Sequence, residues 1–197
     1  IVNENNLILI EDCAHTMGAL WKDQRSGNFG LAGCFSTQTY KHLNSGEGGL
    51  LTSNDEEFMA RAIIYSGSYM LYERHGAAPS SKVFEDIRLE TPNHSGRMDN
   101  LRASILRPQL KNLDKNISRW NERYKIVEAA LKDIKGIEVP LRLEEEKYVG
   151  SSIQFRIAGI TQTEAELFIK KNKELGVELK WFGNDDPSGF TSNHKSW

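Results

Sequence analysis

Cysteine is scarce in this sequence. Cys13 and Cys34 are its only two cysteines, and their separation matches no metal-ligand spacing. A disulfide framework is therefore excluded, and we expect both thiols to be reduced and buried in a cytoplasmic protein. The sequence also lacks an apolar run that approaches the length of a membrane span, and no signal-peptide pattern opens it.

An excess of either charge is also missing. The 25 Lys and Arg residues nearly balance the 27 Asp and Glu residues, which gives a net charge of −2. This balance gives no reason to expect a nucleic acid or an anionic membrane as a partner. Internal repeats and low-complexity tracts are absent too. What remains is an ordinary composition in a chain of 197 residues, which is long enough for one sizeable core or for a core and a smaller lobe.

Two apolar runs near the start of the chain each lead to residues with reactive side chains. Leu7 to Ile10 is fully apolar and precedes an acidic pair that ends in Asp12. We interpret the run as a buried strand with a carboxylate just past its carboxyl end, where ligands bind in open α/β sheets. A second apolar run, Ala32 to Phe35, leads to Ser36 and then to Lys41.

A lysine is ordinarily a solvated surface charge, but the surroundings of Lys41 favour a chemical role. The glycine-rich turn at 46–49 gives the backbone freedom to approach a ligand closely, and it lacks the lysine and hydroxyl ending of a nucleotide-binding P-loop. A carboxylate and a lysine that each leave a strand suit pyridoxal phosphate (PLP). Its aldehyde needs a lysine amine and its ring nitrogen needs an anion, while its phosphate needs hydroxyls such as that of Ser36.

Three sequence blocks carry a family resemblance: EDCAHTMGA at 11–19, CFSTQTYKHLNSGEGGLLTSNDEEF at 34–58 and GRMDNLRASILRPQL at 96–110. In this order and spacing the sequence resembles the DegT-type family of fold-type I PLP enzymes, best known as sugar-nucleotide aminotransferases. The resemblance covers residues 6 to 130 well and the rest weakly. Family members are roughly twice as long, near the size of a domain pair. We therefore expect the chain to be a fragment that lacks an N-terminal half.

The resemblance implies an α/β fold of type I. Residues 1–110 would form the C-terminal part of the PLP-binding large domain, with a mixed sheet. Residues 111–197 would form a linking helix and a small, incomplete C-terminal α+β domain. Cofactor sites in such proteins are completed by a second subunit, so a homodimer is expected.

The resemblance also implies roles for individual residues. Asp12 would hold the cofactor's ring nitrogen, and Lys41 would bind its aldehyde and later act as the base. Ser36 would bind the phosphate. His15 occupies the position of a polar residue that touches the ring or its phenolic oxygen, although a histidine satisfied within the core is the alternative. No metal is expected.

One position departs from the family pattern. Where the family often has an asparagine that reaches the phosphate of the neighbouring subunit, this sequence has Ser95, with Asn93 and His94 just ahead. Arg97 matches the pattern. We therefore expect Ser95, Asn93 or Arg97 to bind the phosphate across the dimer.

The predicted activity is the transfer of an amino group from an amino-acid donor, expected to be glutamate, to a keto group, expected to be on a nucleotide-activated sugar. Two alternatives stay open. One is a PLP-dependent sugar dehydratase, although that branch carries histidine at the position of Lys41, and the other is a homologue that binds PLP without catalysis. The stretch from Lys180 to Trp197 lacks the tyrosine and histidine pattern of sugar-nucleotide enzymes, which leaves the acceptor open.

Local patterns predict the remaining elements. Strands are expected at 33–37, 50–52, 151–157 and 177–181, and loops at 21–31 and 144–147. A helix capped by Ser53 or Asn54 should run to about Tyr65. A second should cover Met98 to Ile134 with its apolar stripe in the core, broken by Pro108 near residue 106 or 107. A third, 161–175, has a capping box. The long segment 66–90 is expected to be functional and, in a fold-type I dimer, to lie near the partner subunit. Candidates for lining a substrate pocket are Tyr65, Tyr69, Tyr72, Arg74 and His75.

Overall fold

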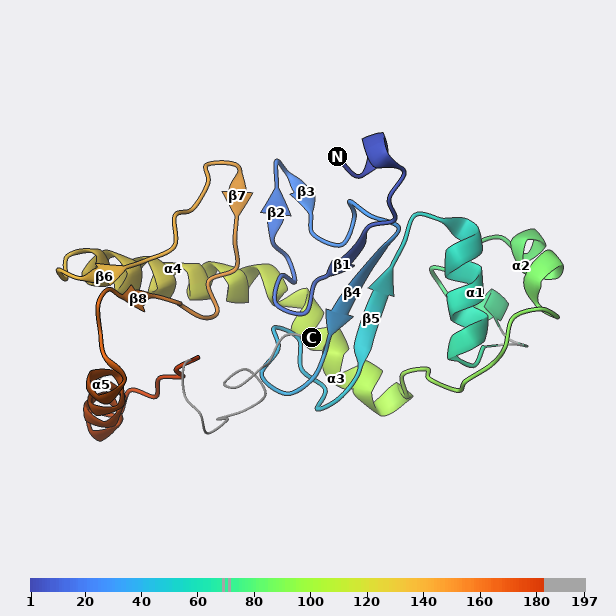
Figure 1. Cartoon of the computed structure of the whole chain (residues 1–197). Coiled ribbons are helices and arrows are strands. Elements are labelled where there is room, and N and C mark those ends of the chain that lie inside the picture. Colours follow the sequence, from blue (N-terminus) through green and yellow to red (C-terminus); the bar gives the residue numbers. More distant parts are fainter. Residues whose placement is uncertain (69, 71, 183–197) are drawn as a thin grey trace. The chain divides into compact units, whose positions relative to one another are not determined.

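The computed structural model describes residues 1–68, 70 and 72–182 (Figure 1). The chain forms two compact units. The first comprises Ile1–Glu128 and Leu141–Ile153, and the second comprises Ala129–Pro140 and the chain from Gln154 onward. The predicted division at residue 110 into a large and a small domain stays a prediction.

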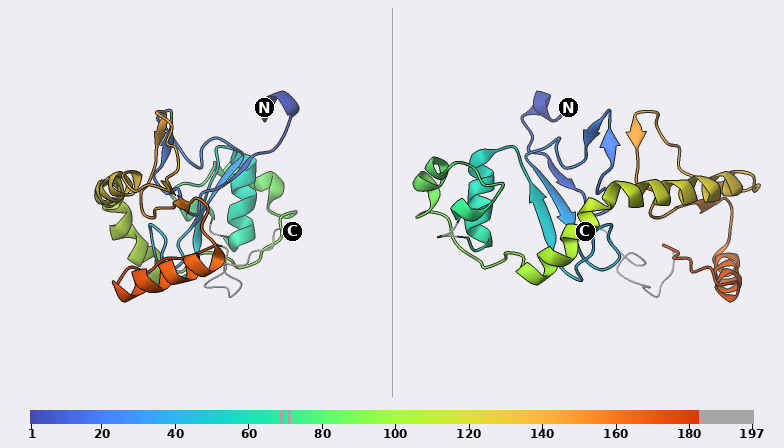
Figure 2. Two further views of the ribbon diagram at one scale, coloured as in Figure 1. Left: turned by 60° about the vertical axis from the view of Figure 1, so that its left-hand side comes forward. Right: turned by 180° about the vertical axis from the view of Figure 1, so that it is seen from behind.

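A mixed three-stranded sheet lies at the centre of the first unit. Its strands, in spatial order, are β1 (Ile10–Asp12), β4 (Ala32–Ser36) and β5 (Gly49–Thr52). They lie side by side in Figure 1 and in the view from behind in Figure 2. β1 and β4 are parallel, with Asp12 opposite Cys34, whereas β4 and β5 are antiparallel. The carboxyl ends of parallel strands lie at the same edge of a sheet. Strands β1 and β4 therefore bring their last residues, Asp12 and Ser36, to this carboxyl edge. The mixed sheet and its helices confirm the predicted α/β fold.

The prediction of a buried strand at Leu7–Ile10 was wrong. Strand β1 begins only at Ile10 and includes Asp12. The side chains of Leu7, Ile8 and Ile10 are 58%, 75% and 61% exposed. β1 is an edge strand of this sheet, and no described element covers these apolar side chains. Cys34 was also predicted to be buried but is exposed, whereas Cys13 is buried, and both are free thiols.

A second small sheet consists of a hairpin and a later segment. Its strands, in spatial order, are β3 (Gln24–Arg25), β2 (Leu20–Trp21) and β7 (Glu146–Lys147). Lys22 and Asp23 form the hairpin turn with φ of 47° and 67°, the left-handed region that two-residue hairpins require. Lys147 forms an ion pair with Asp23. Both segments were predicted as loops, because each strand has only two residues and the pairing of β2 with β7 joins distant parts of the chain.

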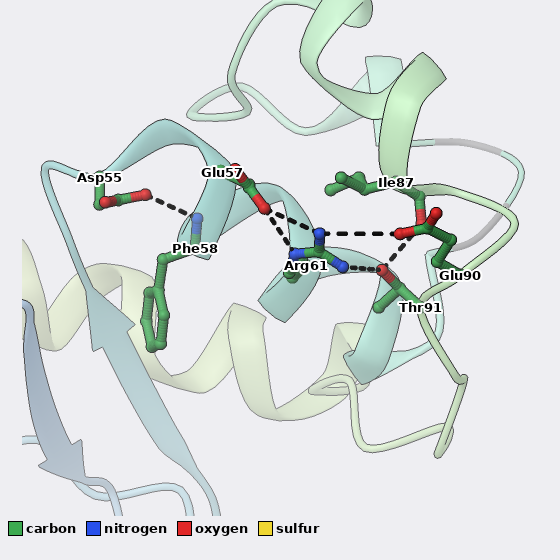
Figure 3. Close-up of polar contacts among 7 residues, drawn as sticks. All are labelled: Asp55, Glu57, Phe58, Arg61, Ile87, Glu90 and Thr91. Atoms are coloured by element: carbon green, nitrogen blue, oxygen red, sulfur yellow. Dashed lines mark hydrogen bonds and ion pairs between the residues drawn. The ribbon is translucent and has the colours of Figure 1, made fainter.

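Helices α1 (Glu56–Ser66) and α2 (Ser81–Ile87) pack together through a buried apolar cluster. Its buried members are Ala60, Ile63, Ile64, Tyr72, Phe84 and Ile87. The cap of α1 is Asp55, whose Oδ1 accepts a hydrogen bond from the Phe58 amide at 2.8 Å (Figure 3). The predicted cap at Ser53 or Asn54 was therefore wrong by one or two residues. Ser53 acts one step earlier, since its Oγ accepts a hydrogen bond from the Asp55 amide.

Arg61 ties α1 to the chain that follows α2 (Figure 3). Its guanidinium donates to Glu57 on the same helix at 2.8 Å and to the Thr91 hydroxyl at 3.4 Å. A more distant ion pair joins it to Glu90, at 4.0 Å. The Thr91 hydroxyl in turn donates to the Ile87 carbonyl at 2.8 Å. These contacts fix the segment after α2, which sequence analysis treated as part of a long loop.

The long helix predicted from Met98 is two helices, α3 (Asn100–Lys111) and α4 (Leu113–Lys132). Pro108 lies inside α3, and the break falls later than predicted, at Asn112. There the Asn112 amide donates to the Gln109 carbonyl at 3.1 Å and its side chain donates to the Pro108 carbonyl at 3.0 Å. The asparagine thus satisfies carbonyls that the end of α3 would otherwise leave unpaired.

The apolar stripe of these helices is less buried than predicted. Leu113 and Tyr124 are buried, but Leu101, Ile105, Leu110 and Val127 are 71%, 43%, 56% and 44% exposed. The described residues cover only one side of α3 and α4. That side holds a second cluster, which comprises buried Leu43, Leu106 and Leu113 with Met17, Met98, Ile117 and Trp120 around them.

The second unit contains strands β6 (Ile137–Glu138) and β8 (Arg156–Ile157), which pair antiparallel, and helix α5 (Gln162–Glu174). The predicted capping box is confirmed, because Thr161 and Glu164 exchange hydrogen bonds at the start of α5. The strand predicted at 151–157 is reduced to its last two residues. The segment 177–181, predicted as a strand, is irregular because it pairs with no described strand.

Short 3-10 helices occur at Asn3–Asn5 and Tyr72–Arg74. Among the helices that the structure describes, none combines the length and the apolarity that crossing a bilayer requires. The described residues also include no group of three or more acidic, histidine or cysteine side chains that could hold a metal ion.

Candidate functional site

Asp12 closes β1 at the carboxyl edge of the parallel strand pair. Its Oδ1 accepts a hydrogen bond from the Ala14 amide at 3.0 Å, which turns the chain away from the sheet. The Cys13 amide still donates to the Cys34 carbonyl at 2.8 Å, so pairing with the neighbouring strand continues just past β1. The Asp12 carboxylate is therefore held at the sheet edge and remains exposed to solvent.

His15 and Lys41 are brought together by this turn and by the loop after β4. Lys41 Nζ lies 2.8 Å from His15 Nε2. An ammonium can only donate, so Nε2 of His15 accepts and its proton resides on Nδ1. Burial and the charge of Lys41 lower the pKa of His15, against the opposing charge of Asp12. Three of the predicted site residues, Asp12, His15 and Lys41, thus lie close enough at the sheet edge for their charges to act on one another.

Ser36 lies at the same edge and begins the loop that carries Lys41. Its Oγ accepts a hydrogen bond from the Gln38 amide at 3.2 Å, which leaves its proton to be donated elsewhere. The loop is closed across its base by the Thr37 amide, which donates to the Gly48 carbonyl at 2.9 Å. Gly48 has φ of 130°, and a Cβ there would lie 2.8 Å from Thr37 Oγ1. This explains one glycine of the predicted turn.

The loop is anchored by the three residues that follow Lys41. Buried His42 places Nε2 2.8 Å from Ser151 Oγ. Leu43, 1% exposed, belongs to the cluster with Leu106 and Leu113. The backbone of Asn44 is held from both sides by Gln109 of α3, which accepts from the Asn44 amide at 2.9 Å and donates to its carbonyl at 2.7 Å. Sequence analysis missed Gln109 and Ser151, since both meet the loop across long stretches of chain.

Glu11 is a further residue that sequence analysis missed. Its Oε2 accepts from the Gly27 amide at 2.7 Å, and its Oε1 accepts from the amides of Phe29 and Gly30 at 2.7 and 2.9 Å. The carboxylate thus fastens the glycine-rich loop at 27–30 to β1. An acidic residue directly before Asp12 and a polar glycine-rich segment were visible in the sequence, but nothing indicated that they meet.

Ser95 and Arg97, predicted to reach the phosphate, lie near the C-terminal end of α1. The guanidinium of Arg97 donates to the Gly67 carbonyl at 2.7 Å. Ser95 has φ of 51°, and its amide donates to Asn93 Oδ1 at 2.9 Å. Across the described residues, no hydrogen bond joins Ser95 or Arg97 to Asp12. Their role across a dimer interface stays a prediction.

The tyrosines proposed for a substrate pocket make contacts within the first unit. Tyr72 is buried and stacks on Phe84, with ring centroids 4.0 Å apart. Tyr65 packs on His94 with centroids 4.3 Å apart. Tyr69 lies outside the described residues, as does most of the C-terminal stretch at 180–197. A pocket role for these side chains stays a prediction.

Comparison with known proteins decides the family. The model of the DegT/DnrJ/EryC1/StrS aminotransferase family matches residues 1–183. The chain belongs to this family. The resemblance inferred from the three sequence blocks is therefore confirmed.

Individual relatives are consistent with this membership. The chain is similar to the spore coat polysaccharide biosynthesis protein SpsC of Bacillus subtilis, with 26% identity over 91% of the chain and 47% of the relative. It is 31% identical to a dTDP-3-amino-3,4,6-trideoxy-alpha-D-glucose transaminase of Micromonospora megalomicea over 76% of the chain and 38% of the relative. The crystal structure of the aminotransferase TlmJ from Streptoalloteichus hindustanus matches 90% of the chain and 45% of its own length, with a TM-score of 0.72 and 20% identity. The chain spans about half the length of the curated relatives it matches, or less.

The residues at the sheet edge fit the cofactor of this family, whose fold-type I aminotransferases depend on PLP. The cofactor needs an amine, an anion and a hydroxyl. Lys41, Asp12 and Ser36 supply these groups from one edge of the sheet, and His15 joins the first two electrostatically.

Proposed function

We propose that the protein is a PLP-dependent aminotransferase. It would take an amino group from an amino-acid donor, glutamate, and give it to a keto group on a nucleotide-activated sugar. The observation that carries this proposal is the placement of Lys41, whose Nζ lies 2.8 Å from His15 at the edge where Asp12 ends β1. Family membership supports the reaction class, and the named activity of the Micromonospora transaminase supports a sugar acceptor.

Lys41 would do two things in this reaction. Its amine would bind the aldehyde of the cofactor, and after release it would carry a proton between the substrate carbon and the cofactor. His15 is neutral because its Nε2 accepts a hydrogen bond from Lys41 Nζ, and partial burial and the nearby cation lower its pKa in the same direction. The histidine therefore orients the amine without adding a second positive charge to the site.

Asp12 and Ser36 would hold the two ends of PLP. The Asp12 carboxylate would keep the ring nitrogen protonated, and this positive charge lets the ring accept electrons from the substrate. The Ser36 hydroxyl would donate to the phosphate. Ser95 or Arg97 would help to bind the phosphate of the PLP held by the second subunit of a homodimer, as the family pattern implies. The bound PLP supplies the electron sink, while the protein supplies position, charge and a movable proton.

A sugar dehydratase on the same scaffold is less well supported. The dehydratase branch of the family has histidine where its aminotransferases have the reactive lysine, and this position is Lys41 here. An amine at this position serves transamination directly. We therefore keep the aminotransferase as the one proposed activity.

A half-reaction experiment tests the proposal. The complete protein that carries this chain would be loaded with PLP and mixed with glutamate in the absence of an acceptor. We expect 2-oxoglutarate to appear in an amount equal to the protein sites, together with pyridoxamine phosphate. A panel of keto-sugar nucleotides would then identify the acceptor by regenerating PLP. A loaded protein that yields no oxo acid from glutamate, glutamine or other amino acids would overturn the proposal and favour the non-catalytic homologue.

A further inference from the structure

His42 is a buried histidine to which the proposed function gives no role. It directly follows Lys41 and is 8% exposed. One side of the ring contacts Trp120 of α4, with ring centroids 5.3 Å apart, and Nε2 lies 2.8 Å from Ser151 Oγ. The ring is therefore fixed by two contacts from distant parts of the chain, immediately beside the proposed reactive lysine.

The hydrogen bonding of His42 determines where its proton lies. Nδ1 is buried and has no hydrogen-bond partner among the residues that the structure describes. A proton on Nδ1 would leave a buried N–H unpaired, which costs more than leaving a lone pair unpaired. His42 is therefore neutral, and its Nε2–H donates to Ser151 Oγ. The surroundings act in the same direction, because burial lowers the pKa of His42 most, and the neighbouring His15 and Lys41 lower it further.

The partner of His42 is held firmly in its own right. The Gly150 amide donates to Asn121 Oδ1 at 2.6 Å, and Asn121 Nδ2 donates to the Tyr148 carbonyl at 3.0 Å. Gly150 also lies so close to α4 that a Cβ there would be 2.5 Å from Tyr124 Cβ. Ser151 thus follows a residue that is fastened to α4, which fixes its place as an acceptor, and it lies three residues before the second compact unit resumes at Gln154.

We infer that His42 is a positioning residue for Lys41. Its hydrogen bond to Ser151, together with its contact with Trp120, fixes the backbone next to Lys41 and so directs Nζ towards His15. This inference rests on the proposed function, since it concerns the amine that would bind PLP. The sequence offers no sign of it, because Ser151 follows His42 by 109 residues.

The test measures the rate at which Lys41 captures PLP in the complete protein. Borohydride quenching at successive times, followed by peptide mapping, gives the fraction of Lys41 labelled. The variants are Ser151→Ala, Ser151→Thr and His42→Phe. The phenylalanine keeps a ring against Trp120 but cannot donate a hydrogen bond to Ser151. Ser118→Ala is the matched serine control, because Ser118 is exposed and within the described part of the chain its hydroxyl donates just to the Asp114 carbonyl of its own helix. Ile63→Val, in the cluster between α1 and α2, controls for general loss of stability.

We expect Ser151→Ala and His42→Phe to slow capture about fivefold, the factor that one hydrogen bond of ordinary net strength provides. The double variant should be no slower than either single one, since both remove the same bond. Ser151→Thr should restore the rate. Ser118→Ala and Ile63→Val should leave it unchanged, the latter despite a lower Tm.

Two capture results would overturn the positioning role and leave the proposed function intact. One is label on Lys41 with an unchanged capture rate in Ser151→Ala, and the other is a slowing in Ile63→Val equal to that in Ser151→Ala. Label on another lysine in the unaltered protein would instead overturn the proposed function, and the positioning role with it. A nitrogen-15 spectrum of the imidazoles provides a check that needs no variant to fold. His42 should carry its proton on Nε2 at neutral pH, and a proton on Nδ1 would contradict the inference.

Discussion

The two sides of the proposed site are held in very different ways. The loop that carries Lys41 is anchored at each of the next three residues, by a buried histidine, a buried leucine and a backbone clamped by Gln109. The strand that carries Asp12 pairs with β4 alone in its sheet, and Leu7, Ile8 and Ile10 beside it are mostly exposed. The carboxylate of Glu11 adds three hydrogen bonds there, to the amides of Gly27, Phe29 and Gly30.

This difference indicates where the geometry of the site is set. An amine that must bind a cofactor and then move a proton benefits from a fixed backbone, since small displacements of reacting groups are costly. A carboxylate that acts through its charge tolerates more freedom. We expect local opening to be harder in the Lys41 loop than along β1, because local stability follows buried contacts.

The largest expected effect follows from removing the amine itself. Lys41→Ala should abolish covalent attachment of PLP, because Lys41 carries the one amine at the sheet edge among residues 1–68, 70 and 72–182. Borohydride reduction of the loaded complete protein and peptide mapping will measure this, with Lys82→Ala as a control on α2. Label found on Lys22 or Lys82 in the unaltered protein would refute the assignment of the site.

Asp12→Asn should retain PLP but slow the half-reaction with glutamate by about 100- to 1000-fold, as removal of one preorganised electrostatic partner does. The amide can still accept the hydrogen bond from the Ala14 amide, so the turn after β1 should survive. Stopped-flow absorbance will give the rate. A rate near that of the unaltered enzyme would remove Asp12 from the mechanism.

The contrast in packing can be measured directly. Leu43→Ala removes a side chain that is 1% exposed and should lower the free energy of unfolding by about 3 kcal/mol. Ile8→Ala, at a side chain that is 75% exposed, should change it by less than about 0.5 kcal/mol. Urea denaturation of both variants will test this pair. Equal losses would show that β1 is covered in the complete protein, and the comparison would have to be revised.

Much of the fold and part of the site could be predicted from local sequence. The strands around Ala32 and Leu50, the capping box at Thr161 and the sheet edge with Asp12 and Ser36 all follow from short apolar runs and cap residues. The same reasoning failed where contacts are long-range. Strands β3 and β7 are polar, and β2 has only two residues, so nothing local indicates that β2 pairs with β7 more than 120 residues later.

Burial was the other weak point of sequence analysis. Apolar residues such as Leu7, Ile8 and Leu101 were assigned to the core from hydrophobicity alone, and all three are exposed in the described structure. Hydrophobicity shows that a side chain gains from burial, but whether another element covers it depends on topology. Likewise Gln109 and Ser151 are ordinary polar residues whose roles arise only from the residues they meet.

The smallest expected effect concerns pH and the two histidines beside Lys41. The pKa values of His42 and His15 are both lowered, by burial of His42 and by partial burial of His15 beside the charge of Lys41. The unfolded chain therefore binds protons at a higher pH than the folded one. Stability should therefore be fully present above about pH 6.5, the value of an unperturbed histidine, and should fall as the pH drops towards the lower pKa of the folded state. Acidification also places a charge on His42, whose buried Nδ1 has no acceptor. The Lys41 loop should loosen before β1 does, which reverses the order expected at neutral pH.

Melting curves between pH 8 and pH 5 will measure the loss of stability. His42→Phe should flatten the pH dependence without removing it, since His15 still titrates. A melting temperature that rises on acidification over this range would contradict the neutral state inferred for both histidines.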